Sequence, residues 1–393
     1  MLSAEHIAIV KSTAPLLESR GEALTTHFYE KLLADHAELR PLFNQAHQAS
    51  GAQARALAKG VLMYARHIDE LEQLGGLVGQ IINKHVALNI LPEHYPVVGQ
   101  CLLQSIRDVF GAHVATNAVI DAWAAAYGQL AALLTGLEEK LYAEREHAPG
   151  GWRGTRAFRV ERKVRESEEI VSFYLRPVDG GPLMSFRPGQ YLGIKLRVNG
   201  EELRRNYSLS AAPDGRDYRI SVKCEANGAA SGHLHANVAE GDTLDVFPPA
   251  GDFVLQPGDK PLVLISGGVG ITPTLAMLQA ALHTGRPVHF IHAARHGGVH
   301  AFRDAVDTLA NGHPQLKRFY CYETARAEDD GAHATGFLDE TRLRDWLPDT
   351  RDADVYFVGP VAFMKAIRKH LRTIGIPDAQ SRYEFFGPAA ALD

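Results

Sequence analysis

The sequence has few cysteines and no excess of positive charge. Its three cysteines, Cys101, Cys224 and Cys321, are odd in number and widely scattered, which argues against a disulfide framework and against a cysteine-based zinc site. Lys plus Arg total 41 and Asp plus Glu total 46, so the formal net charge is −5. A mildly acidic chain is poorly suited to binding nucleic-acid phosphate, and we expect no nucleic-acid partner.

Long hydrophobic runs are also missing. No segment reaches about 18 uninterrupted apolar residues, so the sequence predicts no transmembrane segment. The N-terminus lacks a basic stretch followed by a long apolar one, which a secretory signal would have. At 46% hydrophobic and 22% charged residues, the composition is that of a globular protein and excludes a fibrous or mostly disordered chain. We therefore expect a cytoplasmic protein.

The length of 393 residues is too great for one core and predicts two or three domains, at roughly 150 residues each. Residues 1–147 read as nearly all helix, because apolar residues recur at intervals of three and four. Ser3 is the expected N-cap of the first helix. A Pro/Gly stretch at 147–151 then marks a boundary.

The chain after this boundary changes character twice. Residues 152–257 contain short β-rich runs separated by turn signals such as Asn199-Gly200, which predicts a small antiparallel Greek-key barrel. The expected strands are 159–164, 170–176, 191–198, 207–211, 218–222 and 243–247. Residues 258–393 alternate strand and helix, with buried strands expected at 262–265, 288–293 and 355–358, which predicts an α/β domain with a parallel sheet.

A glycine-rich turn follows the first strand of this third domain and reads G-x-G-x-x-P. Gly268 and Gly270 would let the backbone approach a phosphate, and the start of the next helix (expected at 272–283) supplies free N–H groups. Pro273 suits the first turn of a helix, where its missing N–H costs nothing. The alternative is an ordinary glycine-rich strand–helix turn, but the position directly after four apolar strand residues favours nucleotide binding.

A second motif, R-x-Y-S, lies in the predicted barrel. Arg205 suits a pyrophosphate, Tyr207 a planar ring, and the Ser208 hydroxyl a ring heteroatom. Either motif alone is weak, but their order along the chain is specific. A barrel with R-x-Y-S followed by an α/β domain that opens with G-x-G-x-x-P resembles the ferredoxin-reductase type of flavin reductase over residues 155–390.

This resemblance implies which residues bind each cofactor. FAD would be bound by Tyr191, Arg205, Tyr207, Ser208 and Ser231, and NADH or NADPH by Gly268, Gly270, Thr272 and Pro273. Phe386 would stack on the isoalloxazine. One departure is that Val358-Gly359-Pro360 stands where many members carry Cys-Gly-Pro. Glu323, just after a predicted strand, would repel a 2′-phosphate and so favours NADH.

A possible metal ligand lies in the helical region. His85 and Glu138 both fall on apolar helix faces, and a buried glutamate is costly unless it is paired. A haem-ligating histidine needs such an acceptor to fix its tautomer, and Tyr95 is a further hydrogen-bond candidate. The alternative for His85 alone is an ordinary core histidine.

Other residues strengthen the haem interpretation through their order. Tyr29, Phe43, Gln53 and Leu57 precede His85 in about 140 helical residues, and the whole chain resembles the flavohaemoglobins, in which a bacterial globin is joined to a reductase. The resemblance implies His85 as the iron ligand of haem b, with Glu138 and Tyr95 as its partners. Tyr29, Gln53 and Leu57 would line the distal side, and Phe43 would pack on the porphyrin. Lys84 and Glu384 would lie at the haem–flavin junction.

The activity that this resemblance implies is nitric oxide dioxygenation: NO and O2 become nitrate, with electrons passed from NADH through FAD to haem. Two alternatives stay open. One is an O2- or NO-binding globin whose reductase only keeps the iron ferrous. The other is an alkyl or lipid hydroperoxide reductase with a lipid bound in the distal pocket. A plain flavin reductase would show no Soret band. We expect a monomer.

Overall fold

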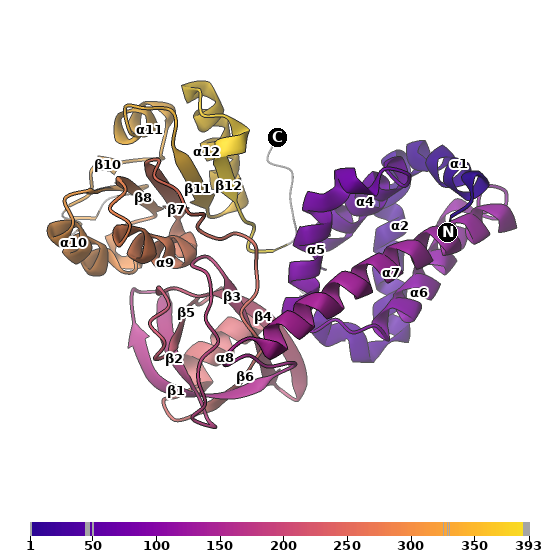
Figure 1. The fold of residues 1–393 in the computed structure, drawn as a ribbon, viewed down its shortest axis with the longest axis horizontal. Helices are drawn as coiled ribbons and strands as arrows, with labels where there is room; N and C mark the ends of the chain where they lie inside the picture. The colour runs from indigo at the N-terminus through magenta and orange to yellow at the C-terminus, as the bar shows by residue number, and fades with distance from the viewer. Residues whose placement is uncertain are drawn as a thin grey trace.

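The computed structural model describes residues 2–43, 48, 51–324, 326–327, 329 and 331–387. Three bodies follow one another along the chain (Figure 1). We call them the helical domain, the barrel domain and the sheet domain. This arrangement agrees with the fold class predicted from the sequence, namely a helical bundle, an antiparallel barrel and an α/β domain.

The helical domain buries two clusters of hydrophobic residues. Its elements are α1 (Ala4–Ser12), α2 (Ala14–Asp35), η1 (Ala37–Leu42), α4 (Ala52–Arg66), η2 (Leu71–Leu74), α5 (Gly75–Ala87), α6 (His94–Phe110) and α7 (Asn117–His147). Ser3 caps α1, as predicted, because its Oγ accepts a hydrogen bond from the His6 amide at 3.1 Å. Leu24, Phe28 and Trp123 are at most 3% exposed. Burial of this apolar stripe, rather than helix propensity, holds the helices together.

Helix α7 is the one helix among the described residues that is long and apolar enough to cross a membrane by length and composition alone. It contacts α1, α5 and α6. Its buried residues include the charged Glu138 and Arg145 as well as Trp123 and Leu134. A core helix of a helical bundle passes the same test of length and composition, and these packing contacts favour that interpretation.

The barrel domain is a six-stranded antiparallel sheet in the order β4-β3-β6-β1-β2-β5. Its strands are β1 (Arg156–Arg165), β2 (Ile170–Pro177), β3 (Tyr191–Val198), β4 (Glu201–Ser208), β5 (Tyr218–Lys223) and β6 (Thr243–Val246). An isolated antiparallel bridge between Leu209 and Ile220 links the continuation of β4 to β5 and closes the barrel.

Two features of the barrel domain differ from the sequence prediction. The strand expected at 207–211 is instead β4, which ends at Ser208 and begins at Glu201. The reason is the turn at Asn199-Gly200: both residues have positive φ, 52° and 85°, which suits a tight two-residue hairpin that pairs β4 with β3 from its first residue. The second difference is helix α8 (Ala229–Asn237), in a region that reads as strand-like in the sequence.

The sheet domain contains a parallel sheet in the order β10-β9-β8-β7-β11-β12. Its strands are β7 (Leu262–Gly267), β8 (Val288–Ala294), β9 (Leu316–Tyr322), β10 (Ala334–Thr335), β11 (Asp354–Val358) and β12 (Ser381–Tyr383). Its short 3-10 turns are η3 (Gly268–Gly270), η4 (Gly297–Val299) and η5 (Asp378–Gln380). All of β7 is buried, as predicted for a strand covered on both faces.

Helices cover both faces of this sheet. Leu262 and Leu264 pack with α9 (Ile271–Leu282) and α10 (Arg303–Gly312), whereas Val263 and Ile265 pack with α11 (Glu340–Trp346) and α12 (Val361–Ile374). This alternation follows from the period of two along a strand. Because β7 and β8 are parallel, their carboxyl ends meet at one edge of the sheet, where open α/β sheets bind ligands.

The linker between the helical and barrel domains is fastened at both ends. Arg153 donates to both carboxylate oxygens of Glu139 on α7, at 2.8 and 2.5 Å, and its guanidinium lies 5.1 Å from the Tyr142 ring. The Trp152 indole donates to the Val246 carbonyl of β6 at 3.0 Å. A Cβ at Gly151 would lie 1.8 Å from the Arg145 carbonyl oxygen, so only glycine allows this close approach.

Candidate functional site

His85 lies in the last turn of α5 and is held by two side chains. Its Nδ1 lies 2.7 Å from Glu138 Oε1 of α7 and 3.1 Å from the Tyr95 hydroxyl of α6. The Tyr95 hydroxyl in turn donates to the same Glu138 oxygen at 2.6 Å. The structure therefore brings together the three residues that the sequence predicts to act together, one from each of three helices.

This arrangement fixes the histidine tautomer. Glu138 is only 2% exposed, so it depends on the His85 Nδ1–H and the Tyr95 O–H as donors. Burial, and then the neighbouring Glu138, raise the pKa of Tyr95 far above its usual range, which keeps its proton in place. With Nδ1 protonated, the His85 Nε2 presents a lone pair.

The His85 Nε2 is available to a ligand. None of the described residues forms a hydrogen bond with this atom, and the His85 side chain is 32% exposed. A histidine with a carboxylate-bound Nδ1 and an open Nε2 is the donor that haem iron takes. The residues present therefore fit an axial haem ligand.

The predicted distal residues come from α2 and α4, and Phe43, predicted to pack on the porphyrin, follows directly after η1. Tyr29 is 8% exposed, and its ring lies 5.5 Å from that of Phe43 in an edge-on contact. Burial raises the pKa of Tyr29 above its usual range, partly opposed by a side-chain hydrogen bond with Gln53. Tyr29 is therefore a neutral phenol that can donate a proton in a hydrogen bond. Leu57 packs against the hydrophobic cluster that contains Tyr29.

The R-x-Y-S residues lie at the end of β4, whereas the sequence predicted a strand that begins at Tyr207. Arg205 is partly buried, and its Nη1 donates to the Arg204 carbonyl at 2.7 Å. Among the described residues no carboxylate pairs with Arg205, and burial lowers its pKa. A partly buried cation without a carboxylate partner suits an anionic ligand such as a pyrophosphate. Burial also raises the pKa of Tyr207, and Ser208 is 8% exposed.

Two further predicted FAD residues occupy different elements. Tyr191 begins β3 and is 6% exposed, and a Cβ at Gly251 would lie 2.7 Å from its ring. Ser231 lies in the first turn of α8, where its Oγ accepts from the Glu225 amide at 3.1 Å. Ser231 therefore orders a loop at a helix start, which is the part of a helix that favours anions.

The glycine turn joins β7 to α9 at the carboxyl edge of the parallel sheet. Gly268 has φ +55°, and a Cβ there would meet nothing within 4 Å, so this position faces open space. Thr272 is in the first turn of α9, and its Oγ1 donates to the Val269 carbonyl at 2.9 Å. Pro273 follows it. The turn thus offers the free N–H groups of a helix start to a phosphate.

Gly270 is required for a different reason. Its φ of −58° suits any residue, but a Cβ would lie 2.4 Å from the Val358 carbonyl oxygen of β11. We expect Gly270→Ala to lower the free energy of unfolding by about 1–3 kcal/mol, as overpacking does, and to slow flavin reduction by NADH. Anaerobic bleaching of flavin absorbance measures the rate, and thermal unfolding the stability.

The matched control for this prediction is Gly312→Ala at the end of α10, where an added Cβ meets nothing within 4 Å. This variant should leave the free energy of unfolding and the rate of flavin reduction unchanged. An unchanged flavin reduction rate in Gly270→Ala would show that the close approach of α9 and β11 has no part in nucleotide binding.

A cluster of charges lies where the three domains meet. Lys84, next to His85, donates from Nζ to the Gly387 carbonyl of the C-terminal tail at 3.0 Å. Burial, and then Asp252, raise the pKa of Glu384 to about 8, with Lys84 acting in the opposite direction. Asp252 of the barrel domain has no motif around it, and the sequence did not indicate it. Phe386 is 44% exposed, whereas Phe385 is partly buried and packs against the core of the sheet domain beside Tyr383.

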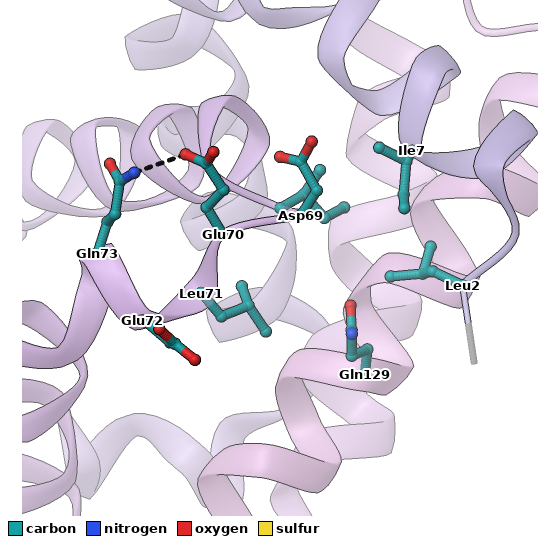
Figure 2. Close-up of a pocket in the computed structure, with 9 residues that line it drawn as sticks. Leu2, Ile7, Asp69, Glu70, Leu71, Glu72, Gln73 and Gln129 are labelled. Atoms are coloured by element: carbon teal, nitrogen blue, oxygen red, sulfur yellow. Dashed lines mark hydrogen bonds between the residues drawn. The ribbon is translucent and has the colours of Figure 1, made fainter.

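A hollow of about 700 Å³ in the helical domain does not involve the predicted site residues. Figure 2 shows its lining, which comes from Leu2 and Ile7 at α1, from residues 68–73 between α4 and α5, which include part of η2, and from Gln129 in the middle of α7. Two of its carboxylates already have partners. Asp69 pairs with Lys11 at 2.6 Å, and Glu70 accepts a hydrogen bond from the side-chain amide of Gln73 at 2.6 Å. These contacts account for two of the three carboxylates in the lining.

The three domains match three family models. Residues 26–134 match the globin model, residues 157–255 the oxidoreductase FAD-binding domain and residues 264–369 the oxidoreductase NAD-binding domain. The fold and the site therefore define a globin joined to an FAD- and NAD-binding oxidoreductase module.

Similarity to curated relatives extends over the whole chain. The chain is 71% identical to the flavohemoprotein of Burkholderia sp. (strain TH2) and 62% identical to that of Pseudomonas aeruginosa, covering 100% of both sequences in each case. The chain thus belongs to the flavohemoprotein family, as the sequence resemblance indicated.

Solved structures agree with this assignment. A flavohemoglobin from Malassezia yamatoensis, with FAD and heme bound, matches with a TM-score of 0.86 at 26% identity, covering 98% of this chain and 100% of that one. The FAD/NAD-binding domain of a nitric oxide dioxygenase from Vibrio cholerae matches with a TM-score of 0.56 at 36% identity, covering 60% of this chain and 100% of that one.

Proposed function

We propose that this protein is an NAD(P)H-dependent nitric oxide dioxygenase that converts NO and O2 to nitrate. The observation that carries the proposal is the hydrogen bond from His85 to the buried Glu138, in a chain that also contains its own reductase. A carboxylate on the proximal histidine makes that ligand more electron-donating, which favours oxygen activation over reversible carriage. A globin that only stores a gas needs no electron supply.

The residues of the chain have separate tasks in this reaction. FAD, when bound, converts hydride equivalents into single electrons, and haem supplies the iron at which the two gases react. Arg205, Tyr207 and Ser208 orient the flavin, with Tyr191 and Ser231, and the Gly268–Gly270 turn with Thr272 and Pro273 orients the nicotinamide nucleotide. Tyr29 donates its proton in a hydrogen bond to a polar diatomic ligand in the distal space, supported by Gln53. Leu57 and Phe43 keep that space apolar.

The deciding experiment measures NADH consumption by the purified holoenzyme in the presence of O2, before and after addition of NO. We expect NO to accelerate consumption and nitrate to accumulate. If an alkyl hydroperoxide accelerates it and NO does not, the protein is a hydroperoxide reductase. If neither does, it is a gas-binding globin with a self-reducing module.

Tyr29→Phe tests the distal role. The variant loses the donor but keeps the ring contact with Phe43, so we expect weaker O2 binding and slower NO-dependent turnover. One lost hydrogen bond corresponds to about a tenfold change or less. Reduction of flavin by NADH should stay at its original rate. The matched control is Tyr64→Phe, because the Tyr64 hydroxyl donates to the Ala126 carbonyl inside the helical core. A change confined to flavin reduction in Tyr29→Phe would contradict the distal assignment of Tyr29.

The finer assignments are also part of this proposal. Glu323 is exposed just after β9 and favours NADH over NADPH, because a carboxylate repels a 2′-phosphate. We place the domain boundaries at 1–147, 152–257 and 258–393, on either side of the fastened linker and before β7. We also propose that the protein is a monomer in the cytoplasm, whose reducing environment agrees with the three free cysteines. A lipid in the distal pocket would be found by extraction and mass spectrometry.

A further inference from the structure

The helix that carries His85 ends directly on the barrel domain. Ala87, the last residue of α5, is completely buried in a small cluster with Tyr191 of β3 and Ala250. Gly193 of β3 has no side chain at this contact, and a Cβ there would lie 2.4 Å from the Ala87 carbonyl oxygen. The absence of a side chain at Gly193 therefore allows the backbone of α5 to rest on the strand.

Arg204 of β4 makes a second contact at the same place. Its Nη1 donates to the Leu88 carbonyl, one residue beyond α5, at 2.5 Å. Its Nε donates to Glu202 at 2.8 Å, and its guanidinium lies 5.3 Å from the Phe247 ring. The Arg204 side chain is only 17% exposed. The last carbonyls of a helix lack partners within the helix and carry partial negative charge, so a cation here is favourable.

The same short segment holds His85. The Leu88 and Ile90 amides both donate to the His85 carbonyl, at 3.1 and 2.9 Å. Any movement of Leu88 therefore moves the backbone of His85. On the other side, Arg204 is adjacent in sequence to Arg205, and neighbouring residues of a strand face opposite ways. One face of β4 thus contacts the haem-bearing helix while the other presents the proposed flavin contact.

We propose that Arg204 is a positioning residue for electron transfer between the two domains. Together with Gly193, it fixes the last turn of α5 on β3 and β4, and so sets the position of His85 relative to the flavin. The proposal rests on the proposed function only in that both cofactors are bound. It assigns Arg204 no contact with substrate or cofactor.

Arg204→Met tests this role, because it keeps much of the aliphatic stem and removes the donors. Hydrogen exchange of the peptide covering residues 84–91 should become about tenfold faster, as expected when a hydrogen bond from a charged group is lost. In anaerobic rapid mixing with NADH, bleaching of the flavin should keep its rate, and the following reduction of the haem should slow. Arg204→Lys keeps the positive charge and a single donor group. It should restore part of the protection from hydrogen exchange and part of the haem reduction rate.

Two further variants make the result unambiguous. Arg159→Met is the matched control, because Arg159 forms the same bond to a glutamate two residues away, at 2.6 Å, on β1; both readouts should stay unchanged. Gly193→Ala should slow haem reduction as Arg204→Met does, whereas Gly128→Ala in α7, where an added Cβ meets nothing within 4 Å, should not.

Unchanged exchange and unchanged haem reduction in Arg204→Met would overturn the proposal, and so would an equal loss of flavin and haem reduction. None of these measurements uses NO. They therefore succeed or fail independently of whether the enzyme is a nitric oxide dioxygenase.

Discussion

His85→Ala is expected to give a protein that retains FAD and loses haem. The substitution removes the ring whose Nε2 is open to a metal, and it leaves Glu138 with Tyr95 as its hydrogen-bond partner. Leaving part of a buried carboxylate unsatisfied costs about 1–3 kcal/mol, so the free energy of unfolding of the helical domain should also fall. The absorption spectrum of the purified variant measures the first effect, as a missing Soret band beside a normal flavin band.

The control for this variant is His94→Ala. His94 begins α6, and its Nδ1 accepts only the Leu91 amide at 3.0 Å, so removing it should leave the Soret band in place. If His85→Ala keeps full haem content with a five-coordinate spectrum, another residue is the iron ligand and the proximal assignment is wrong.

Glu138→Gln is expected to keep the haem and lose most of the NO-dependent turnover. A glutamine is nearly the same size and its oxygen still accepts from His85 Nδ1, but it carries no charge, so the histidine becomes less electron-donating. Changes to such partners of a metal ligand typically cost about 10–100-fold in activity. NO-dependent NADH consumption and the iron–histidine stretching frequency measure the two effects, and both should decrease.

The neighbouring Glu139→Gln is the matched control. Glu139 is exposed and pairs with Arg153 of the linker, so it should alter neither the stretching frequency nor the flavin reduction rate. A Glu138→Gln variant with unchanged frequency and turnover would mean that the carboxylate serves only to stabilise the fold.

Much of the fold and part of the site could be predicted from the sequence, because their signals are local. The buried run at 262–265, the glycine turn after it and the R-x-Y-S motif each occupy a few consecutive residues, and they lie in β7, η3 and β4. His85 and Glu138 are 53 residues apart in sequence. Their pairing could still be predicted, because a glutamate on an apolar helix face needs a hydrogen-bond partner.

What could not be predicted depends on contacts between domains. Arg204 has no periodicity or motif that separates it from other strand arginines, and its function arises only because the Leu88 carbonyl lies opposite it. No sequence pattern indicates Asp252 either, although it raises the pKa of Glu384. Helix α8 was missed because nine residues are too few for a helical period to stand out from the surrounding strands.

The fastened linker has a kinetic consequence. Because Trp152 ties the linker to β6 of the barrel domain and Arg153 ties it to α7 of the helical domain, the electron donor and the electron acceptor never have to find each other by diffusion. A short connection of this kind corresponds to an effective concentration on the order of millimolar or above, far beyond what a separate reductase reaches in a cell. Haem reduction should therefore be first order and independent of protein concentration, so a cell containing very few copies would detoxify at the same rate per molecule as one containing many.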